Sequence, residues 1–417
     1  MGGKYDLAVV GGGPAGLAAA VKAWSLGVER VILIDESEFL GGVLTQCIHT
    51  GFGLHYFKED LTGPEFAARL LERLKSTGVE VLNGAYVAQL CVGPGGLKEV
   101  YGYRRGEAFK IDCGAVVYAA GCRERSRFEA GILGDRPVGV YTAGEAQALM
   151  DVYGVLPGER VVVVGSGDVG LIVARRLALE GAEVKAVVEV MPYPGGLTRN
   201  VVQCLEDFNI PLYLSHSVVE VKGSRRVESV RIAKVDEGLN PINGTGFELD
   251  CDTVILAVGL KPRVELLARA GAFIDEATGG PIVNDWLETS IPGVFAAGNV
   301  LVVNDLVDYA AEQGELAAES ASRSIREGGL PKVGFKRVVR GGNVRLVVPQ
   351  MVSCLRDVVF YGRVVRPEEN VSIRFEEVER YFKLPVVRPS EMFRFYLSAE
   401  ELVKIRGDRL TVSVFKV

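Results

Sequence analysis

Glycines at regular spacings and a cysteine–histidine pair are the residues of this sequence whose types and positions could do chemistry. Gly11, Gly13 and Gly16 follow a short apolar run at residues 7–10. At this spacing the first glycine makes a tight turn, and the second lets the backbone approach a pyrophosphate at a helix N-terminus. The third lets the helix pack closely on the strand. This pattern predicts a strand–turn–helix unit that binds a dinucleotide.

A carboxylate follows this glycine segment at a suitable distance. The second apolar run, residues 31–34, ends at Asp35. A carboxylate at the end of the second strand of such a unit accepts hydrogen bonds from the adenosine ribose. Asp35 therefore joins the predicted nucleotide site.

The same set of residues recurs 154 positions further along the chain. Gly11, Gly13, Gly16, Gly27, Asp35, Gly41 and Gly42 correspond to Gly165, Gly167, Gly170, Gly181, Glu189, Gly195 and Gly196. The second copy also has its own apolar run, residues 161–164, and its own helical pattern. This repeat predicts two Rossmann-like units, each able to bind one dinucleotide.

Two further segments repeat each other, residues 111–125 and 249–263. Each has the pattern of a buried strand that ends in a glycine, Gly121 or Gly259. Residues 293–299 show the pattern a third time. We expect the first two strands to join the sheets of their own units and to bring their glycines to the ligand.

Composition excludes several classes of protein. The net charge of −6 disfavours nucleic-acid binding, because a polyphosphate chain would be repelled. No apolar run approaches the roughly 18 residues that span a bilayer, and no signal peptide pattern precedes the first strand. The seven cysteines contain no Cys-x-x-Cys pair. The sequence therefore predicts a cytoplasmic protein without a transmembrane segment.

With these features in place, residues 5 to about 328 resemble the FAD- and NAD(P)-dependent pyridine nucleotide-disulfide oxidoreductases, in a layout like that of thioredoxin reductase. The segment 289–300 strengthens the resemblance. It implies an α/β fold with two Rossmann-like, three-layer ββα domains. The first would bind FAD and the second, inserted into it, the nicotinamide nucleotide. The expected domains are 1–150 and 251–330 for FAD, 151–250 for NAD(P)H, and a small β-rich domain at 331–417.

The fingerprints and the resemblance together identify the expected cofactor-binding residues. For FAD these are Gly11, Gly13, Pro14, Ala15, Gly16, Asp35, Glu36, Gly42, Val43, Ala120, Gly121, Gly298, Asn299, Leu306 and Val307. For the nicotinamide nucleotide they are Gly165, Gly167, Asp168, Val169, Gly170, Glu189 and Gly259.

The sequence departs from the family pattern in two ways. The family's redox-active disulfide is missing, so the resemblance does not imply a thioredoxin reductase. The acidic residue that contacts the flavin ribityl chain in the family is here Asn299. Its amide can still accept and donate hydrogen bonds. Asp305 is expected to cap the following helix, with the amides of Leu306 and Val307 facing the flavin.

Residues 136–147, 165–176 and 191–200 resemble a narrower group. This group contains flavin subunits of opine and cyanide-forming oxidases and the oxidoreductases that accompany glycerol-3-phosphate dehydrogenase. Residues 41–54 are most similar to the glycerol-3-phosphate companions. The resemblance implies a flavin electron-transfer subunit that works between a nicotinamide nucleotide and a partner dehydrogenase.

Cys47 and His49 are the candidate catalytic residues. We expect them at the start of a helix beside the flavin, where a helix N-terminus and an imidazole would favour a thiolate for redox or proton-relay chemistry. A packing role is favoured for Cys47 because no resolving cysteine lies nearby. A metal site that adds His55 is disfavoured because the spacing fits no common zinc pattern. No metal is therefore expected.

Glu189 should bind the ribose hydroxyls and repel a 2′-phosphate, so we expect NADH rather than NADPH. A surface carboxylate contacted by Arg199 is the alternative. The C-terminal domain has too few cysteines for an iron–sulfur cluster, and we expect it to dock a partner or to form a homo-oligomer.

Three functions remain open from the sequence. The first is an FAD-dependent NADH oxidoreductase that exchanges electrons with a partner dehydrogenase. The second is a free-standing NADH oxidase or peroxidase that uses Cys47 as its redox thiol. The third is a non-catalytic scaffold subunit that only binds nucleotides.

Overall fold

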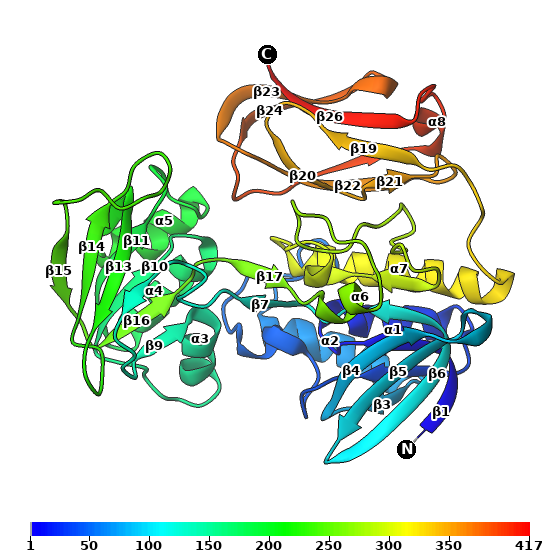
Figure 1. Ribbon diagram of the computed structural model, residues 1–417, viewed down its shortest axis with the longest axis horizontal. Coiled ribbons are helices and arrows are strands. Elements are labelled where there is room, and N and C mark those ends of the chain that lie inside the picture. The colour runs from blue at the N-terminus through cyan, green and yellow to red at the C-terminus, as the bar shows by residue number, and fades with distance from the viewer. Residues whose placement is uncertain (1) are drawn as a thin grey trace. The chain divides into compact units, whose positions relative to one another are not determined.

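The computed structural model describes residues 2–417, which fold into two compact units. The first contains the chain up to Cys122 together with Pro262–Val417, and the second contains Arg123–Lys261. The strands β7 (Cys122–Glu124) and β17 (Leu260–Pro262) pair with each other where the chain passes from one unit to the other (Figure 1). Among the described residues, no helix is both long and apolar enough to cross a membrane.

The first unit is built on a seven-stranded sheet in the order β3-β2-β1-β6-β5-β4, with β18 also paired to β6. Its strands are β1 (Gly2–Val10), β2 (Val31–Ile34), β3 (Glu80–Leu82), β4 (Ala85–Val92), β5 (Lys98–Arg104), β6 (Glu107–Tyr118) and β18 (Val294–Ala296). β3, β2, β1, β6 and β18 are parallel, whereas β4 and β5 are antiparallel. β2 and β18 are apolar and buried along their whole length, and β1 is so over its last four residues, because both faces of the sheet are covered there.

Helices of this unit are α1 (Pro14–Ser25), α2 (Gly63–Lys75), α6 (Glu265–Arg269) and α7 (Val307–Glu327), with the short 3-10 turns η1 (Gly42–Gln46), η2 (Pro94–Gly96) and η4 (Gly298–Val300). Small residues let α1 and α7 approach closely: a Cβ on Gly314 would lie 2.0 Å from the Ala15 carbonyl oxygen. This packing holds the start of α1 against α7.

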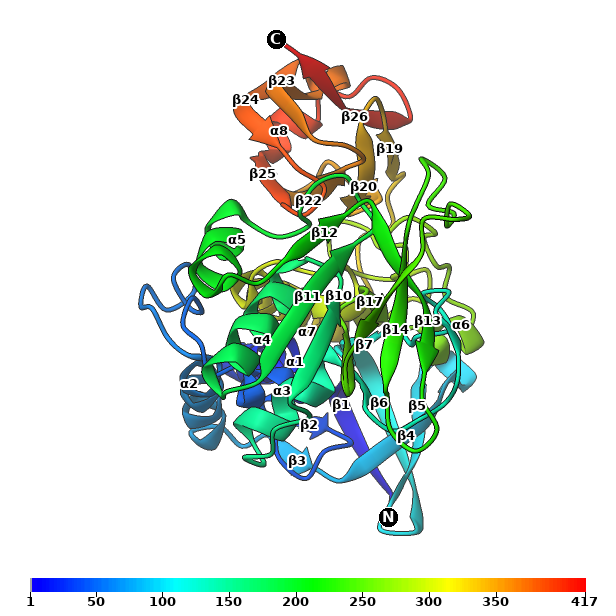
Figure 2. The same ribbon diagram turned by 90° about the vertical axis from the view of Figure 1, so that its left-hand side faces the viewer.

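The second unit has three layers. Its parallel sheet, in the order β12-β11-β10-β16-β9, contains β9 (Val140–Thr142), β10 (Arg160–Val164), β11 (Glu183–Glu189), β12 (Leu212–Leu214) and β16 (Thr253–Leu256). A second sheet contains β8 (Leu133–Gly134), β13 (His216–Lys222), β14 (Ser229–Lys234) and β15 (Phe247–Asp250). Figure 2 labels its strands β13 and β14. The helices are α3 (Ala143–Asp151), α4 (Asp168–Leu179), α5 (Thr198–Cys204) and the turn η3 (Glu206–Phe208).

The side chains of β10 point alternately to the two faces of its sheet, and this alternation explains the three layers of the second unit. Val161 and Val163 belong to the core formed with α3 and α4, and Val162 and Val164 belong to the core formed with the second sheet. A strand that is apolar at every position can thus be covered on both faces. This is the ββα arrangement expected from the sequence.

The second unit is wider than the range 151–250 expected from the sequence. Val140–Thr142 pairs with β16, and β16 pairs with β10, so the residues before 151 and after 250 share its sheet. The spacing of the glycines predicted the position of the loop after β10. It gave no signal for β16 and β9, which follow β10 in the same sheet.

The C-terminal domain has two sheets within the first unit, in the orders β21-β19-β26-β23-β24 and β20-β22-β25. Its strands are β19 (Lys336–Arg340), β20 (Val344–Val348), β21 (Met351–Val352), β22 (Val358–Val364), β23 (Glu368–Phe375), β24 (Arg380–Val387), β25 (Phe393–Leu397) and β26 (Arg409–Lys416), with η5 (Glu376–Val378) and α8 (Ala399–Leu402). Phe360, Phe375 and other apolar side chains from both sheets fill one core. The expected β-rich domain is therefore present.

Candidate functional site

The first glycine loop connects β1 to α1, and close backbone contacts determine its shape. Gly11 has φ +107°, and a Cβ there would lie 2.3 Å from the Ala119 carbonyl oxygen. A Cβ on Gly16 would lie 1.7 Å from the Gly11 carbonyl oxygen. Gly13 differs, because its backbone is extended and a Cβ would meet nothing within 4 Å. Gly13 thus leaves open the space that a pyrophosphate requires at the start of α1.

The Asp35 carboxylate fixes the shape of this loop through hydrogen bonds to the backbone. One of its carboxylate oxygens accepts a hydrogen bond from the Gly12 amide, and the other accepts one from the Ser37 amide at 2.7 Å. Gly41 donates to the Gly12 carbonyl at 2.9 Å, which brings the start of η1 against the loop. The Asp35 carboxylate therefore shapes the loop in addition to its predicted contact with a ribose.

The second glycine loop, between β10 and α4, repeats these contacts. Cβ atoms on Gly165 and Gly170 would lie 2.2 Å from the Ala257 carbonyl oxygen and 2.3 Å from the Gly165 carbonyl oxygen. Gly167 is extended, and its Cβ would meet nothing within 4 Å. Asp168 accepts hydrogen bonds from the Leu197 amide at 2.9 Å and the Asn200 side chain at 2.7 Å.

Glu189 corresponds to Asp35 in this second loop. Its Oε2 accepts hydrogen bonds from the Ser166 amide at 2.9 Å and the Ser166 hydroxyl at 2.6 Å, and its Oε1 accepts one from the Met191 amide at 2.9 Å. The residue is 7% exposed, so it is not the surface carboxylate of the alternative interpretation. No hydrogen bond or ion pair joins it to Arg199 within the described chain.

Other predicted FAD residues gather around the first loop. A Cβ on Gly42 would lie 3.1 Å from the Gly13 Cα, and one on Gly298 would lie 2.8 Å from the Ala15 Cβ. Val43 is exposed. Glu36 forms an ion pair with Arg263, a partner that the sequence analysis did not anticipate.

Asn299 stands in a network of amides. Its Oδ1 accepts hydrogen bonds from the Asn304 amide at 3.0 Å, and its Nδ2 donates to the Cys122 sulfur at 3.6 Å. Gln313 accepts from the Gly298 amide at 3.0 Å and donates to the Asn304 Oδ1 at 3.0 Å. The neutral Asn299 is therefore positioned by its neighbours rather than by a charge.

The predicted cap of α7 is wrong by one residue. Leu306, not Asp305, occupies the N-cap position, and no side chain caps the helix. Asp305 instead forms an ion pair with Arg363 and accepts a hydrogen bond from the Met392 amide at 2.6 Å. Asp305 therefore joins the C-terminal domain to the rest of the first unit. The sequence could not show this because both partners come from the far end of the chain.

Asp308, in the first turn of α7, was missed by the sequence analysis. It is 1% exposed and accepts hydrogen bonds from the backbone amides of Gly53 at 3.2 Å, His55 at 2.9 Å and Tyr56 at 2.7 Å. This carboxylate clamps the loop that follows Cys47 and His49. An acidic residue in the first turn of a helix was the one available signal.

Cys47 does not begin a helix, contrary to the prediction. It follows the last residue of η1, and its thiol donates to the Val43 carbonyl at 3.3 Å. The His49 Nδ1 lies 2.9 Å from the Thr50 carbonyl oxygen, and its ring lies 4.9 Å from that of Phe52. The N-terminus of α2 packs against Cys47, because the Gly63 amide donates to the Cys47 carbonyl at 2.8 Å and a Cβ on Gly63 would lie 2.8 Å from the Cys47 Cβ. The helix N-terminus near this cysteine is therefore that of α2, and not that of a helix beginning at Cys47.

Residues 2–417 contain seven cysteines and three histidines, besides many carboxylates. No disulfide joins any of the seven cysteines, and burial raises the pKa of Cys113 and Cys251 to about 12. No group of three or more His, Cys, Asp or Glu side chains in this range could hold a metal ion.

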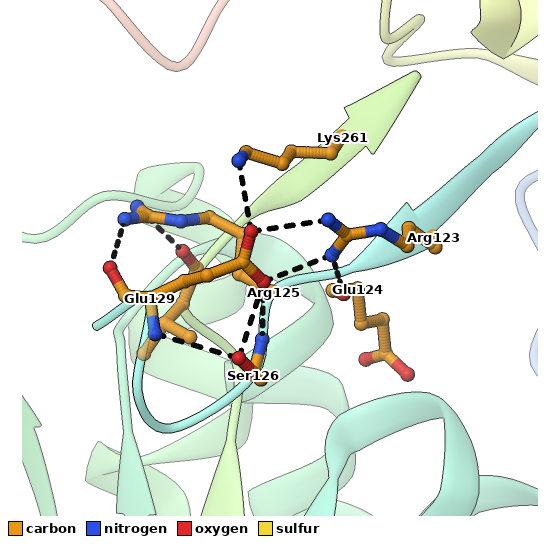
Figure 3. Close-up of polar contacts among 7 residues, drawn as sticks. Arg123, Glu124, Arg125, Ser126, Glu129 and Lys261 are labelled. Carbon is orange, nitrogen blue, oxygen red and sulfur yellow. Dashed lines mark hydrogen bonds and ion pairs between the residues drawn. The ribbon is translucent and has the colours of Figure 1, made fainter. Parts of the chain in front are cut away.

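An ion-pair cluster ties the first and last strands of the second unit together. The Glu129 carboxylate accepts hydrogen bonds from Arg123 at 2.9 Å, Lys261 at 2.8 Å and the Ser126 amide at 3.0 Å (Figure 3). Arg123, Lys261 and the Ser126 amide, in this order, hold the pKa of Glu129 well below its usual range. The cluster links β7 to β17 through Glu129, and its residues form no recognisable sequence motif.

Two parallel-sheet units with matching glycine loops define a dinucleotide-binding oxidoreductase of the two-Rossmann class. The chain belongs to the pyridine nucleotide-disulphide oxidoreductase family, whose model matches residues 5–314. It is 30% identical over 363 residues to a dihydrolipoyl dehydrogenase of Pseudomonas aeruginosa, covering 78% of this chain and 72% of that protein. It is 30% identical over 311 residues to a thioredoxin reductase of Aquifex aeolicus, covering 71% and 85%.

Solved structures agree with this fold. The chain matches the crystal structure of T. acidophilum thioredoxin reductase with a TM-score of 0.64 and 25% identity, covering 77% of this chain and 98% of that one. Lactococcus lactis thioredoxin reductase matches with a TM-score of 0.64 and 23% identity, covering 78% and 99%. The predicted fold class and superfamily are confirmed. The family match ends at residue 314, before the C-terminal domain.

Proposed function

We propose that this protein is an FAD-dependent NADH oxidoreductase that moves a hydride between a nicotinamide nucleotide and the flavin. One observation carries the proposal: each unit has a loop whose outer glycines are locked by backbone contacts while the middle glycine opens onto space. Two dinucleotides of different kinds need two such loops. When bound, FAD accepts a hydride from reduced nicotinamide and passes the electrons on.

The chain's own residues bind and orient the first dinucleotide. Gly13 and the amides at the start of α1 would hold the pyrophosphate of FAD, and Asp35 would accept from its ribose. Asn299 would offer its amide to the ribityl chain, since Asn304 already orients its Oδ1. Leu306 and Val307, at the start of α7, would present backbone amides to the flavin ring.

Glu189 supports a preference for NADH. Its two carboxylate oxygens are held by the loop that would carry the pyrophosphate of the nicotinamide nucleotide. A 2′-phosphate would add negative charge near this fixed carboxylate, whereas ribose hydroxyls can donate to it. NADPH should therefore bind more weakly than NADH.

The electron acceptor is proposed to be a partner dehydrogenase, of the glycerol-3-phosphate type that residues 41–54 resemble. The two cysteines nearest to each other in the sequence are nine positions apart, which supports a route that does not pass through a Cys-x-x-Cys dithiol. No second cysteine lies near Cys47 in the sequence to resolve an oxidised thiol, which disfavours the peroxidase alternative.

The test is electron transfer to an artificial acceptor. The purified protein is loaded with FAD and supplied with NADH or NADPH and ferricyanide. We expect NADH to support ferricyanide reduction better than NADPH, and Cys47→Ser to retain the activity. Turnover of peroxide that Cys47→Ser abolishes would favour the thiol peroxidase instead. Nucleotide binding without reduction of any acceptor would favour the scaffold.

A further inference from the structure

Three amide side chains of the first unit, those of Asn299, Asn304 and Gln313, are hydrogen-bonded in series. Gln313 lies in α7 and is 1% exposed, Asn304 lies between η4 and α7, and Asn299 lies in η4. Within residues 2–417, no charged side chain donates to this amide network or accepts from it. The network is therefore neutral, and its effect depends on which atom of each amide faces which neighbour.

Backbone groups fix the orientation of the first two amides. The Gly298 backbone amide can only donate, so the Gln313 atom that it contacts at 3.0 Å must be the oxygen Oε1. The Gln313 nitrogen is then the atom that donates to the Asn304 Oδ1 at 3.0 Å. Independently, the Val302 carbonyl can only accept, so the Asn304 atom 3.0 Å from it must be the nitrogen Nδ2. Both constraints give Asn304 the same orientation.

Asn299 is oriented in the same way. Its Oδ1 lies 3.0 Å from the Asn304 backbone amide, which can only donate, and 3.3 Å from the Asn304 Nδ2. This oxygen therefore already accepts two hydrogen bonds. The Asn299 Nδ2 makes one contact with the described chain, 3.6 Å from the Cys122 sulfur. An amide nitrogen can donate twice and sulfur is a weak acceptor, so this nitrogen keeps a donor for a ligand.

The remaining donor lies at the predicted flavin site. Cys122 directly follows Gly121, a residue expected to contact FAD, and a Cβ on Gly121 would meet nothing within 4 Å. On the other side of Asn299, a Cβ on Gly298 would lie 2.8 Å from the Ala15 Cβ in the first turn of α1. The Asn299 side chain therefore stands between the first glycine loop and the open space at Gly121.

We propose that Asn304 and Gln313 are positioning residues for the flavin, which hold Asn299 so that it presents a neutral N–H donor to the ribityl chain. The inference rests on the FAD site of the proposed function. A carboxylate at position 299 would instead present an acceptor and a negative charge. Because reduction adds negative charge to the flavin, the neutral donor favours the reduced flavin more than a carboxylate would.

A double-mutant cycle on FAD affinity tests the positioning role, with the full chain and flavin fluorescence as the readout. Asn304→Leu removes the side-chain amide at similar volume and should weaken FAD binding about three- to tenfold, the equivalent of one hydrogen bond. In the Asn299→Ala background most of this loss should disappear, because no amide is left for Asn304 to position. Equal losses in the two backgrounds would overturn the proposal.

Asn304→Asp tests the orientation of Asn299 in the same cycle. Its second oxygen would face the Asn299 Oδ1, so the loss of FAD affinity should exceed that of Asn304→Leu. The excess should largely disappear in the Asn299→Ala background, whereas a direct effect of the added charge on FAD would persist there. An Asp variant no weaker than the Leu variant, or an excess that persists in full, would overturn the assigned orientation.

Ser322→Ala is the control for general loosening of α7. The Ser322 hydroxyl is buried and donates to the Ala318 carbonyl at 2.6 Å, outside the amide network. This variant should leave FAD affinity unchanged. A loss as large as that of Asn304→Leu would show that affinity follows the stability of the helix, and would refute the positioning role.

The midpoint potential of the bound flavin tests the neutrality of the site. Asn299→Asp should retain FAD, because Asn304 still donates to one carboxylate oxygen, and should shift the potential to more negative values. An unchanged potential would overturn the proposal. Neither measurement uses a nicotinamide nucleotide, so these contrary results would refute only this inference. A wild-type chain that binds no FAD would refute the proposed function as well.

Discussion

Replacing Asp308 with alanine should loosen the loop around residues 53–56 without unfolding the unit. The Asp308 carboxylate accepts three backbone hydrogen bonds, at 2.7, 2.9 and 3.2 Å, and the side chain is 1% exposed. A hydrogen bond to a charged group contributes about 1.5–3 kcal/mol. Water can reach the partly buried amides of His55 and Tyr56 in the variant, but not the buried amide of Gly53. The net local cost should therefore be about 3 kcal/mol.

Hydrogen exchange measures this cost residue by residue. A loss of about 3 kcal/mol corresponds to roughly a hundredfold faster exchange for the Gly53, His55 and Tyr56 amides, if local opening limits the exchange. Asp308→Asn keeps one acceptor oxygen and should give an intermediate increase. Asp250→Asn changes an exposed carboxylate on β15 and should change nothing in this loop. Unchanged exchange in Asp308→Ala would refute the assignment of this carboxylate as the clamp.

Four further substitutions follow from the geometry. Gly13→Ala should keep the unfolding free energy within about 0.5 kcal/mol, as should the control Gly334→Ala, because a Cβ meets nothing within 4 Å at either position. Gly13→Ala should nevertheless lower FAD affinity in a fluorescence titration. A large loss of stability would contradict the open space at Gly13. Gly167→Ala should weaken NADH binding while the bound flavin content stays the same, and loss of flavin instead would reverse the assignment of the two loops. Glu189→Gln should lower the NADH-to-NADPH preference in kcat/KM by about tenfold, and an unchanged ratio would remove Glu189 from specificity. Arg363→Met removes the guanidinium that pairs with the exposed Asp305 and should cost about 1–3 kcal/mol, measured as a lower midpoint of thermal unfolding. An unchanged midpoint would show that this ion pair does not stabilise the contact of the C-terminal domain.

The parts of the structure that could be predicted from the sequence depend on local backbone geometry. Gly11 and Gly16 had to be glycines because a Cβ would meet a carbonyl oxygen, and the same holds for Gly165 and Gly170. Such constraints leave a fixed spacing in the sequence, and the repeat of that spacing revealed both units. The alternation of Val161–164 between two cores is local in the same sense.

The parts that could not be predicted depend on contacts between distant segments. Asp305 would cap α7 by its position in the sequence, but it pairs with Arg363 of the C-terminal domain. Cys47 lies in an irregular segment shaped by Asp308, about 260 residues away, so its position after η1 had no local signal.

The central claim is hydride transfer between a nicotinamide nucleotide and a flavin held by this chain. Anaerobic rapid mixing of the FAD-loaded protein with excess NADH or NADPH, followed through the absorbance of the oxidised flavin, tests it most directly. We expect NADH to bleach the flavin in a single turnover, NADPH to do so more slowly, and Gly167→Ala to raise the NADH concentration required. A protein that retains FAD and binds NADH, but whose flavin neither nucleotide bleaches, would contradict it.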